Sequence, residues 1–421
     1  MNILLMIVAA IGFFVLILVS IALHEVGHMV PAKRFGVRVS QYFVGFGKTI
    51  WSKQVGETEY GLKLIPLGGY VRLVGMFPPE SKRRTGRLAQ IANEARATEW
   101  ETITPDDVRD QRLFYQKKTW QKLIVMFGGP FMNILLAYGI FLGINQFHGQ
   151  LQSTLQIKSV VACVTEAPAA CVESPAKAAG AQPGDTIVAF NGQPVSRWSD
   201  LVTLVRANGS GTVRLTVDRG GQRIDLTPVP GAVRTMAALD DPTKTVEAGF
   251  VGVQPNSALV RVGPVQIAID MWDLTRQSVV ALIGFPAKVI TTAYDLVTGK
   301  PRDVNGPISV VGASRAAGEI ATTERLTTQS RIASYFSLLA GVNLFVALLN
   351  LVPLLPFDGG HIAGALWEGL RRAVSRLLRR RDPGYVDTAR LLPVAYVVGG
   401  FLLFAGAVLI VADIISPVRI F

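Results

Sequence analysis

The chain has 421 residues, of which half are apolar and only 17% are charged, and its formal net charge is +12. Soluble globular domains usually carry about 25% charged residues, so this composition excludes an ordinary soluble enzyme and a disordered chain and indicates a membrane protein. Two cysteines exclude a disulfide-rich scaffold and a zinc module with four cysteine ligands.

Four apolar runs predict transmembrane helices, because about 20 apolar residues cross a hydrocarbon core of roughly 30 Å. The sequence therefore predicts an α-helical polytopic membrane protein with helices at residues 1–30, 122–147, 335–357 and 392–416. A fifth apolar stretch, residues 279–293, is shorter and contains Pro286 and Lys288. We expect this stretch to be amphipathic and to lie on the membrane surface.

The distribution of basic residues predicts the orientation. Residues 31–122 contain 17 lysines and arginines against 9 acidic residues, and residues 361–390 contain 7 against 3. Residues 148–331 are nearly balanced, with 17 against 15. Because loops rich in lysine and arginine stay in the cytoplasm, the N-terminus and residues 148–331 are expected outside. Topology and contacts with the lipid bilayer account for the basic excess, so direct nucleic-acid binding is not expected.

The segments between the predicted helices differ in composition. Residues 31–121 form a predicted cytoplasmic loop with a membrane-associated β-hairpin at about 58–74, which Gly68 and Gly69 interrupt. The other predicted segments are an external loop at 148–173, a compact α+β unit at 174–230 (or from near 155), an external juxtamembrane region at 231–334 and a basic cytoplasmic loop at 358–391.

The end of the first predicted helix carries the motif His24-Glu25-Val26-Gly27-His28. Two histidines four residues apart share one face of a helix, so both imidazoles can bind one zinc ion. Glu25, on the neighbouring face, can act as the base for the attacking water. Ionisable residues against an apolar span are costly and indicate a functional site. The alternative is a pair of interfacial histidines beside a glutamate that reaches the aqueous phase.

A catalytic zinc site needs three protein ligands and one open position. The candidate for the third ligand is Asp358, which follows the third predicted helix in the sequence Pro356-Phe357-Asp358-Gly359-Gly360. In the predicted topology the first and third helices run in the same direction, so the HExxH motif and Asp358 lie at similar depth. The alternatives are His361 as the ligand and Asp358 as a turn or capping residue.

These motifs carry a resemblance to a known family. An HExxH motif in a first transmembrane helix, followed later by the run from Asn350 to Gly360 with its two prolines and Asp-Gly-Gly, resembles the site-2 protease family of intramembrane zinc metalloproteases. Four helices with one PDZ-like unit between the second and third resemble its bacterial branch of the regulator of sigma-E protease (RseP) type. Segments 66–71, 128–133 and 305–309 also resemble family segments. The chain differs in having one recognisable PDZ-like unit, and Phe357 where many relatives have leucine.

The resemblance implies a protein of the bacterial cytoplasmic membrane that performs regulated intramembrane proteolysis. It implies one Zn²⁺ per chain, held by His24, His28 and Asp358, with Glu25 as the general base. The implied substrates are membrane-spanning proteins of the anti-sigma factor type that an upstream site-1 protease has already cut. Cleavage would then release a cytoplasmic transcription regulator.

Two further elements are candidates for substrate binding. The strand with Gly68, Gly69 and Tyr70 can pair with an extended substrate, because a cleaved helix must exchange its internal hydrogen bonds for others. The side-chain amide of Asn350 can hydrogen-bond the substrate backbone. Ordinary loop structure for the strand, and a helix–helix hydrogen bond for Asn350, are the alternatives.

The external region leads to two more expectations. We expect the PDZ-like unit to act as a gate that excludes substrates with large external domains, with peptide binding as the alternative. Cys163 and Cys171 are a disulfide candidate because they lie outside the cytoplasm, and two free thiols are the alternative.

Two other functions compete with proteolysis. A zinc transporter has no need of Glu25 and usually shows inverted repeats, which this sequence lacks. An inactive membrane scaffold does not explain the intact HExxH motif together with Asp358.

Overall fold

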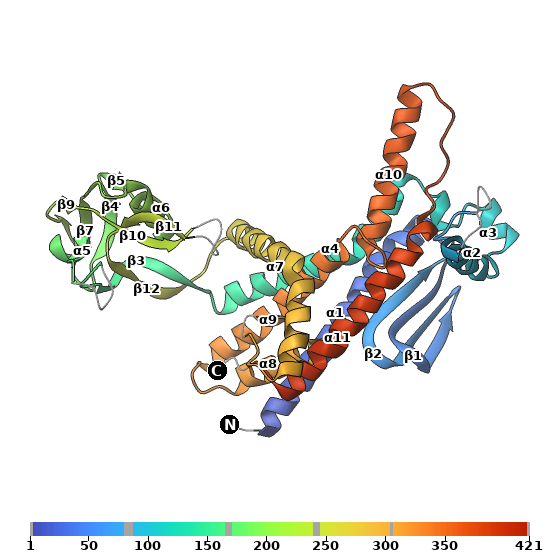
Figure 1. The fold of residues 1–421 in the computed structure, drawn as a ribbon, viewed down its shortest axis with the longest axis horizontal. Coiled ribbons are helices and arrows are strands. Elements are labelled where there is room, and N and C mark those ends of the chain that lie inside the picture. The colour runs from blue at the N-terminus through green and yellow to red at the C-terminus, as the bar shows by residue number, and fades with distance from the viewer. Residues whose placement is uncertain (1–2, 80–86, 165–170, 239–244, 304–305, 419–421) are drawn as a thin grey trace. The chain divides into compact units, whose positions relative to one another are not determined.

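The computed structural model describes residues 3–79, 87–164, 171–238, 245–303 and 306–418 (Figure 1). The chain forms two compact units. Met1–Phe147 and Gly263–Phe421 together make the first, which we call the helical unit, and His148–Val262 make the second, the inserted unit.

Five helices of the described residues are long and apolar enough to cross a membrane. Four of them correspond to the predicted spans, namely α1 (Ile3–Arg34), α4 (Thr119–Phe147), α9 (Thr328–Asn350) and α11 (Leu392–Ile415). The helix α9 ends at Asn350 and not at residue 357 as predicted. Pro353 and Pro356 explain the earlier end, because proline has no N–H for a helical hydrogen bond.

The fifth apolar helix, α7 (Pro264–Thr298), corrects the prediction of a short surface segment at 279–293. It is 35 residues long and continues through Pro286. A proline inside an apolar helix is tolerated where neighbouring helices pack around the freed backbone groups. The helix begins after Gly263 and stops at Gly299, which adopts the left-handed conformation that favours glycine.

Shorter helices complete the helical unit. The predicted basic loop 358–391 is largely helical, because α10 (Asp358–Leu377) occupies its first half. The sequence reading missed α10 because its two glycines and many arginines resemble a loop composition. The other elements are α2 (Arg87–Trp100), α3 (Pro105–Arg109), η1 (Phe114–Gln116), α8 (Val310–Thr322) and η2 (Thr388–Leu391).

The helices α1 and α4 cross at a pair of glycines. A Cβ atom on Gly27 would lie 2.3 Å from the carbonyl oxygen of Gly128, and a Cβ on Gly128 would lie 2.0 Å from that of Gly27. Small residues allow backbones to approach this closely in apolar surroundings. The crossing brings the second half of the HExxH motif against the first half of α4.

The predicted hairpin is larger than the sequence indicated. It consists of β1 (Val39–Val55) and β2 (Thr58–Leu73), so it begins at residue 39 and not at 58. Residues 41–44 of β1 pair with 69–72 of β2 on one side and with 59–62 on the other. The pairings recorded for residues 69–73 lie on one side only, which makes this end of β2 an edge of the sheet.

The inserted unit is an α+β fold around a buried apolar core. Its main sheet has the strand order β12 (Val253–Val260), β3 (Gln150–Val160), β4 (Thr186–Phe190), β7 (Leu215–Arg219) and β8 (Gln222–Asp225), with β5 (Gln193–Pro194) beside β4. The predicted boundaries 174–230 are too narrow, because the unit spans His148–Val262. Strand β12 pairs antiparallel with β3, and these two strands come from opposite ends of the unit. Sequence patterns within one segment could not reveal that pairing.

The elements of the inserted unit are β3 (Gln150–Val160), α5 (Pro175–Ala178), β4 (Thr186–Phe190), β5 (Gln193–Pro194), α6 (Trp198–Asn208), β6 (Thr212–Val213), β7 (Leu215–Arg219), β8 (Gln222–Asp225), β9 (Val229–Pro230), β10 (Ala232–Ala237), β11 (Thr245–Phe250) and β12 (Val253–Val260).

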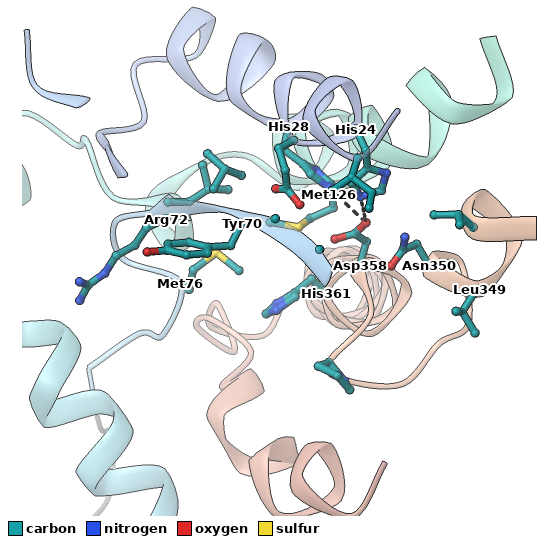
Figure 2. Close-up of a pocket in the computed structure, with 18 of the residues that line it drawn as sticks. His24, His28, Tyr70, Arg72, Met76, Met126, Leu349, Asn350, Asp358 and His361 are labelled. Atoms are coloured by element: carbon teal, nitrogen blue, oxygen red, sulfur yellow. Dashed lines mark hydrogen bonds and ion pairs between the residues drawn. The ribbon is translucent and has the colours of Figure 1, made fainter. Parts of the chain in front are cut away.

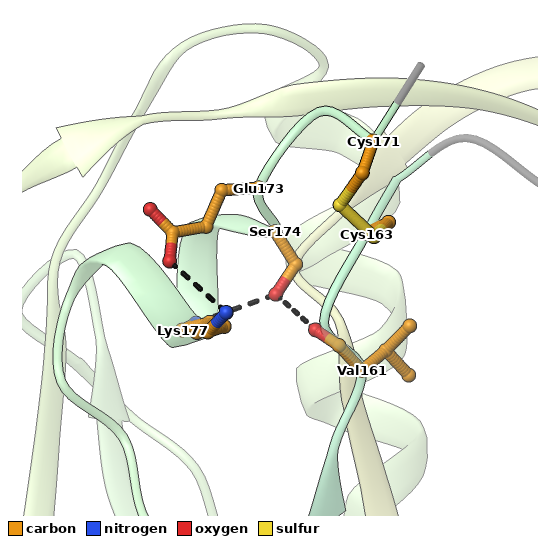
Figure 3. Close-up of a disulfide and its surroundings, with 6 residues drawn as sticks. All are labelled: Val161, Cys163, Cys171, Glu173, Ser174 and Lys177. Atoms are coloured by element: carbon orange, nitrogen blue, oxygen red, sulfur yellow. Dashed lines mark hydrogen bonds and ion pairs between the residues drawn. A yellow bond between two sulfur atoms is a disulfide. The ribbon is translucent and has the colours of Figure 1, made fainter. Parts of the chain in front are cut away.

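A disulfide joins Cys163 to Cys171, with Cα atoms 5.2 Å apart, so the predicted pairing is confirmed (Figure 3). Residues 165–170 of its loop lie outside the described residues. Cys163 also forms an isolated β-bridge with Glu173. Next to it, the Ser174 hydroxyl donates to the carbonyl of Val161 and accepts from the N–H of Lys177 at the start of α5. The disulfide therefore closes the loop directly before this cap.

Candidate metal centre and active-site cavity

Three side chains predicted from separate motifs meet at one point (Figure 2). The Nε2 atoms of His24 and His28 lie 3.3 and 3.2 Å from Oδ2 of Asp358. The two Nε2 atoms lie 3.2 Å from each other. Among the described residues, His24, His28 and Asp358 are the one group of three or more His, Cys, Asp or Glu residues with ligand atoms close enough for a shared metal ion.

The size of this triangle fits zinc. Protein nitrogen and oxygen ligands bind zinc at about 2.0–2.1 Å, and tetrahedral geometry then separates two ligand atoms by roughly 3.3–3.4 Å. The three observed separations are 3.2–3.3 Å. In addition, Oδ2 of Asp358 is buried and makes no hydrogen bond. The donor set and its spacing therefore suit a zinc ion with a fourth position open.

The helix α4 holds His28 in the tautomer that a metal requires. Nδ1 of His28 lies 2.8 Å from the carbonyl oxygen of Val125, so the Nδ1–H donates to it and Nε2 keeps its lone pair. A carbonyl oxygen has two lone pairs, so the Val125 carbonyl can accept from His28 in addition to any bond within its own helix. His28 is therefore oriented by backbone from another helix.

The glycine Gly129 makes room for the two imidazoles. A Cβ at this position would lie 2.2 Å from Nε2 of His28 and 2.7 Å from Nε2 of His24. Any other residue would push directly against the two ligand atoms. The signal in the sequence is the Gly-Gly-Pro run of α4, which resembles a family segment but does not by itself indicate a contact with the histidines.

The helix α10 begins at Asp358, and its two following glycines allow the tight turn that carries it. A Cβ on Gly359 would lie 2.2 Å from the carbonyl oxygen of Val352, and one on Gly360 would lie 2.7 Å from the N atom of Leu355. The Asp-Gly-Gly sequence thus packs the start of α10 onto the loop after α9. This contact sets the position of the Asp358 carboxylate.

Glu25 lies between the triad and the edge of the β-sheet. Glu25 and the β2 residues Gly69 and Val71 line the same cavity. A Cβ on Gly69 would lie 3.2 Å from Cγ of Glu25, so the backbone of β2 passes directly over this side chain. The base candidate and the edge strand therefore share one site.

A cavity of about 870 Å³ connects these elements. Every predicted site residue of the helical unit lines it, which includes Gly68, Gly69, Tyr70 and Asn350. Its lining residues on α1 run from Phe14 to His28, and Glu99 of α2 also lines it. A cavity lined over this length of α1 can hold an extended peptide of several residues.

His361 also lines the cavity but does not join the triad. The geometry therefore favours Asp358 over His361 as the third ligand. Sequence reasoning missed Met126, Met76 and Phe77, which line the same cavity. No local pattern distinguishes such residues from ordinary apolar ones.

Two ionisable groups near the cavity have shifted pKa values. Burial raises the pKa of Tyr42 to about 12, and the nearby carboxylate of Glu25 adds to the shift. The Tyr42 hydroxyl therefore stays protonated, and it donates to the carbonyl of Ala22 in α1. Burial also raises the pKa of the Glu99 carboxyl, although the N–H groups of Met76 and Phe77 donate to it and oppose the shift.

Comparison with known proteins identifies the family. The profile of peptidase family M50 matches residues 12–380. The chain belongs to this family. It is 34% identical to the zinc metalloprotease Rip1 of Mycobacterium tuberculosis, over 97% of this chain and 98% of that protein. Rip1 of Mycolicibacterium smegmatis is 33% identical with the same coverage. The zinc metalloprotease RasP of Oceanobacillus iheyensis is 25% identical, over 86% of this chain and 90% of that protein.

Family membership confirms the resemblance to site-2 proteases of the RseP type. The chain is a zinc metalloprotease with several apolar helices, and its cofactor is Zn²⁺.

Proposed function

We propose that this zinc metalloprotease is an endopeptidase that cleaves single-span membrane proteins within the bilayer. The observation that carries the proposal is the convergence of a zinc-sized triad, a carboxylate base and an unpaired strand edge on one cavity that extends along an apolar helix. By the chain's family, the substrates are of the anti-sigma factor type, trimmed beforehand by a site-1 protease. Their cleavage releases a cytoplasmic transcription regulator.

In this proposal His24, His28 and Asp358 hold one zinc ion. When bound, zinc polarises the scissile carbonyl and makes a water acidic enough to attack near neutral pH. Glu25 takes the proton from that water and passes it to the leaving nitrogen.

The edge strand and Asn350 bind the substrate backbone. A transmembrane helix hides its carbonyls in internal hydrogen bonds, so a protease must unwind it and offer other partners. Residues 69–73 of β2 offer such an edge directly beside Glu25. Asn350 ends α9 and lines the same cavity near Asp358, where its amide can reach the extended chain (Figure 2).

Four crossings suffice for this arrangement, with the N-terminus and the inserted unit outside. The carbonyl of Pro264 at the start of α7 accepts from Tyr138, in the half of α4 away from the triad. After α7, Arg302 pairs with Asp413 near the end of α11. Both ends of α7 therefore lie away from the triad, so in this proposal α7 enters and leaves the bilayer on one side. The basic loops place the triad toward the cytoplasm.

The inserted unit is proposed to be PDZ-like and to restrict access by substrates with large external domains. It is a compact unit of its own, formed by His148–Val262. Its disulfide is compatible with an oxidising compartment outside the cytoplasm.

The decisive experiment uses the purified chain in nanodiscs with a single-span reporter substrate, with mass spectrometry of the products. Glu25→Gln should keep zinc yet lose turnover by roughly 10²–10⁴-fold or more, because only the base changes. Glu101→Gln, an exposed glutamate at the end of α2, is the matched control. Normal turnover by Glu25→Gln would refute the assigned base, and cleavage only outside the span would refute intramembrane proteolysis.

The same preparation separates the two competing functions. A transporter would move zinc into sealed vesicles with and without Glu25, and it would cut no reporter. An inactive scaffold would do neither.

A further inference from the structure

The helix α10 carries a face of large apolar side chains that remain exposed in the described part of the chain. These side chains recur every three or four residues, which places them on one side of the helix. Each is at least 45% exposed. We call them the apolar stripe of α10: Leu366, Trp367, Leu370, Val374, Leu377 and Leu378. Unlike the apolar spans, α10 also contains several arginines and is not among the helices suited to crossing a membrane.

The opposite face of α10 is fixed to α4. The Lys122 ammonium lies 2.9 and 3.0 Å from the two carboxylate oxygens of Glu368, and both side chains are buried. Arg372 adds a second contact to Glu368 at 3.0 Å. A Cβ on Gly369 would lie 2.9 Å from the Thr119 side chain, so the two helices are in close contact. This packing turns the apolar stripe away from the protein.

The contact with α4 also indicates where the apolar stripe begins relative to the membrane surface. Gly369 lies against Thr119, the first residue of α4. Next to it, Trp120 is 52% exposed and stacks edge-on against Phe35 at the end of α1. Exposed tryptophans and neighbouring lysines mark the interface between hydrocarbon and water. From there α10 extends past α4 by about 12 Å, at 1.5 Å per residue (Figure 1).

The far end of α10 is strongly basic. Arg376 and the run Arg379, Arg380 and Arg381 are exposed. In the described part of the chain these four arginines form no ion pair, whereas Arg372 is paired with Glu368. The stripe therefore begins at the membrane interface and leads to a cluster of unpaired positive charges.

We propose that α10 docks on an anionic lipid surface through its apolar stripe and the arginines at its end. Because α10 extends outward from the level of Thr119, docking requires its outer half to lie against the membrane surface. The stripe would then face the headgroups and upper acyl chains, and Arg379, Arg380 and Arg381 would contact phosphate groups. Near an anionic membrane each such arginine favours the docked state by roughly fivefold. Because α10 begins at Asp358, docking also steadies the helix that carries the third candidate ligand.

The test places one fluorescent probe on the stripe. The two native cysteines form a disulfide, so Val374→Cys supplies the one free thiol of the full-length chain for an environment-sensitive label. The labelled protein is placed in nanodiscs of phosphatidylcholine with or without phosphatidylglycerol. We expect a blue shift and quenching by lipid-borne quenchers, both larger with phosphatidylglycerol. A label at the neighbouring Ser375→Cys, on another face of the helix, serves as the control and should respond to neither.

A second variant tests the charges. Changing Arg379, Arg380 and Arg381 together to glutamine should shift the docking equilibrium of the Val374 probe by about 100-fold toward water. The matched control changes Arg197, Arg214 and Arg223 to glutamine, three exposed arginines of the inserted unit, and should leave the probe unchanged. Zinc content equal to that of the parent chain verifies that each variant is folded.

Three outcomes would overturn the proposal. One is a probe at residue 374 that stays in water in both lipid mixtures. Another is lipid burial that is independent of phosphatidylglycerol and of the three arginines. The third is disulfide cross-linking between two Val374→Cys chains without lipid quenching, which would identify a second copy of the chain as the occupant.

Discussion

The substitution Gly129→Ala tests whether the space behind the two histidines sets the geometry of the metal centre. The new Cβ would lie 2.2 Å from Nε2 of His28 and 2.7 Å from Cε1 and Nε2 of His24. Relief to a normal contact needs a shift of about 1 Å, yet a metal ligand tolerates only about 0.2 Å. Because both ligand atoms face the same methyl group, rotation of one ring does not remove the clash.

We expect a large loss of zinc affinity with little loss of fold. Disturbing groups that orient metal ligands typically costs about 10–100-fold in metal affinity, and a misplacement near 1 Å costs about 100-fold in rate. Gly129→Ala should therefore weaken zinc binding by roughly 100-fold. Its helical content should stay normal, because alanine favours a helix more than glycine does.

The assay is competition for zinc between the purified protein and a chromophoric chelator, together with circular dichroism and reporter cleavage. Gly139→Ala and Gly143→Ala are matched controls on the same helix, since a Cβ at either position meets nothing within 4 Å. Zinc affinity and turnover in Gly129→Ala equal to those of the two controls would refute the packing argument. An unfolded variant would be recognised by its lost helical signal, and Gly129→Ser would then serve as the polar counterpart with the same expected clash.

Asp358→Ala should lower zinc occupancy by about tenfold or more, whereas His361→Ala should keep its zinc. Metal analysis of both purified variants tests this, and loss of zinc in His361→Ala alone would reverse the assignment of the third ligand. Residues 150–260 can be removed at neighbouring positions, because Gln150 pairs with Val260, and the deletion leaves every residue of the triad in place. The deletion variant should cleave untrimmed substrates. A folded variant that cleaves none of them would contradict the proposal that the inserted unit restricts access. The Arg219 guanidinium holds the pKa of the Asp185 carboxyl below its ordinary value. The ionised carboxylate therefore stabilises the inserted unit fully at pH values above the pKa of Asp185 in the unfolded chain. This stabilisation is lost as the pH falls through the lower pKa of the folded protein. In Arg219→Gln, hydrogen exchange of the full chain should show acid unfolding of this unit beginning at a higher pH, and an unchanged midpoint would contradict the linkage.

The sequence by itself determined the features that depend on short-range periodicity. Two histidines spaced by four residues must share a helix face, so their joint role follows from local geometry. Long apolar runs must be helical in a bilayer, because no other segment satisfies its own backbone, and four of the helices were predicted at nearly their observed positions. The cysteine pair was predictable for a different reason, because the charge distribution placed both residues outside the cytoplasm, where disulfides persist.

Only the tertiary structure decided which distant groups complete the site. The carbonyl of Val125 orients His28, and Gly129 leaves room for both rings, although neither residue has a side chain that suggests chemistry. Asp358 was a candidate among alternatives until its carboxylate was found within 3.3 Å of both histidines. The full length of α7, the helix α10 and the pairing of β3 with β12 also escaped the sequence reading. For the metal centre and for the pairing of β3 with β12, the deciding contact joins residues far apart in the chain, and packing between such residues leaves no periodic pattern within either segment.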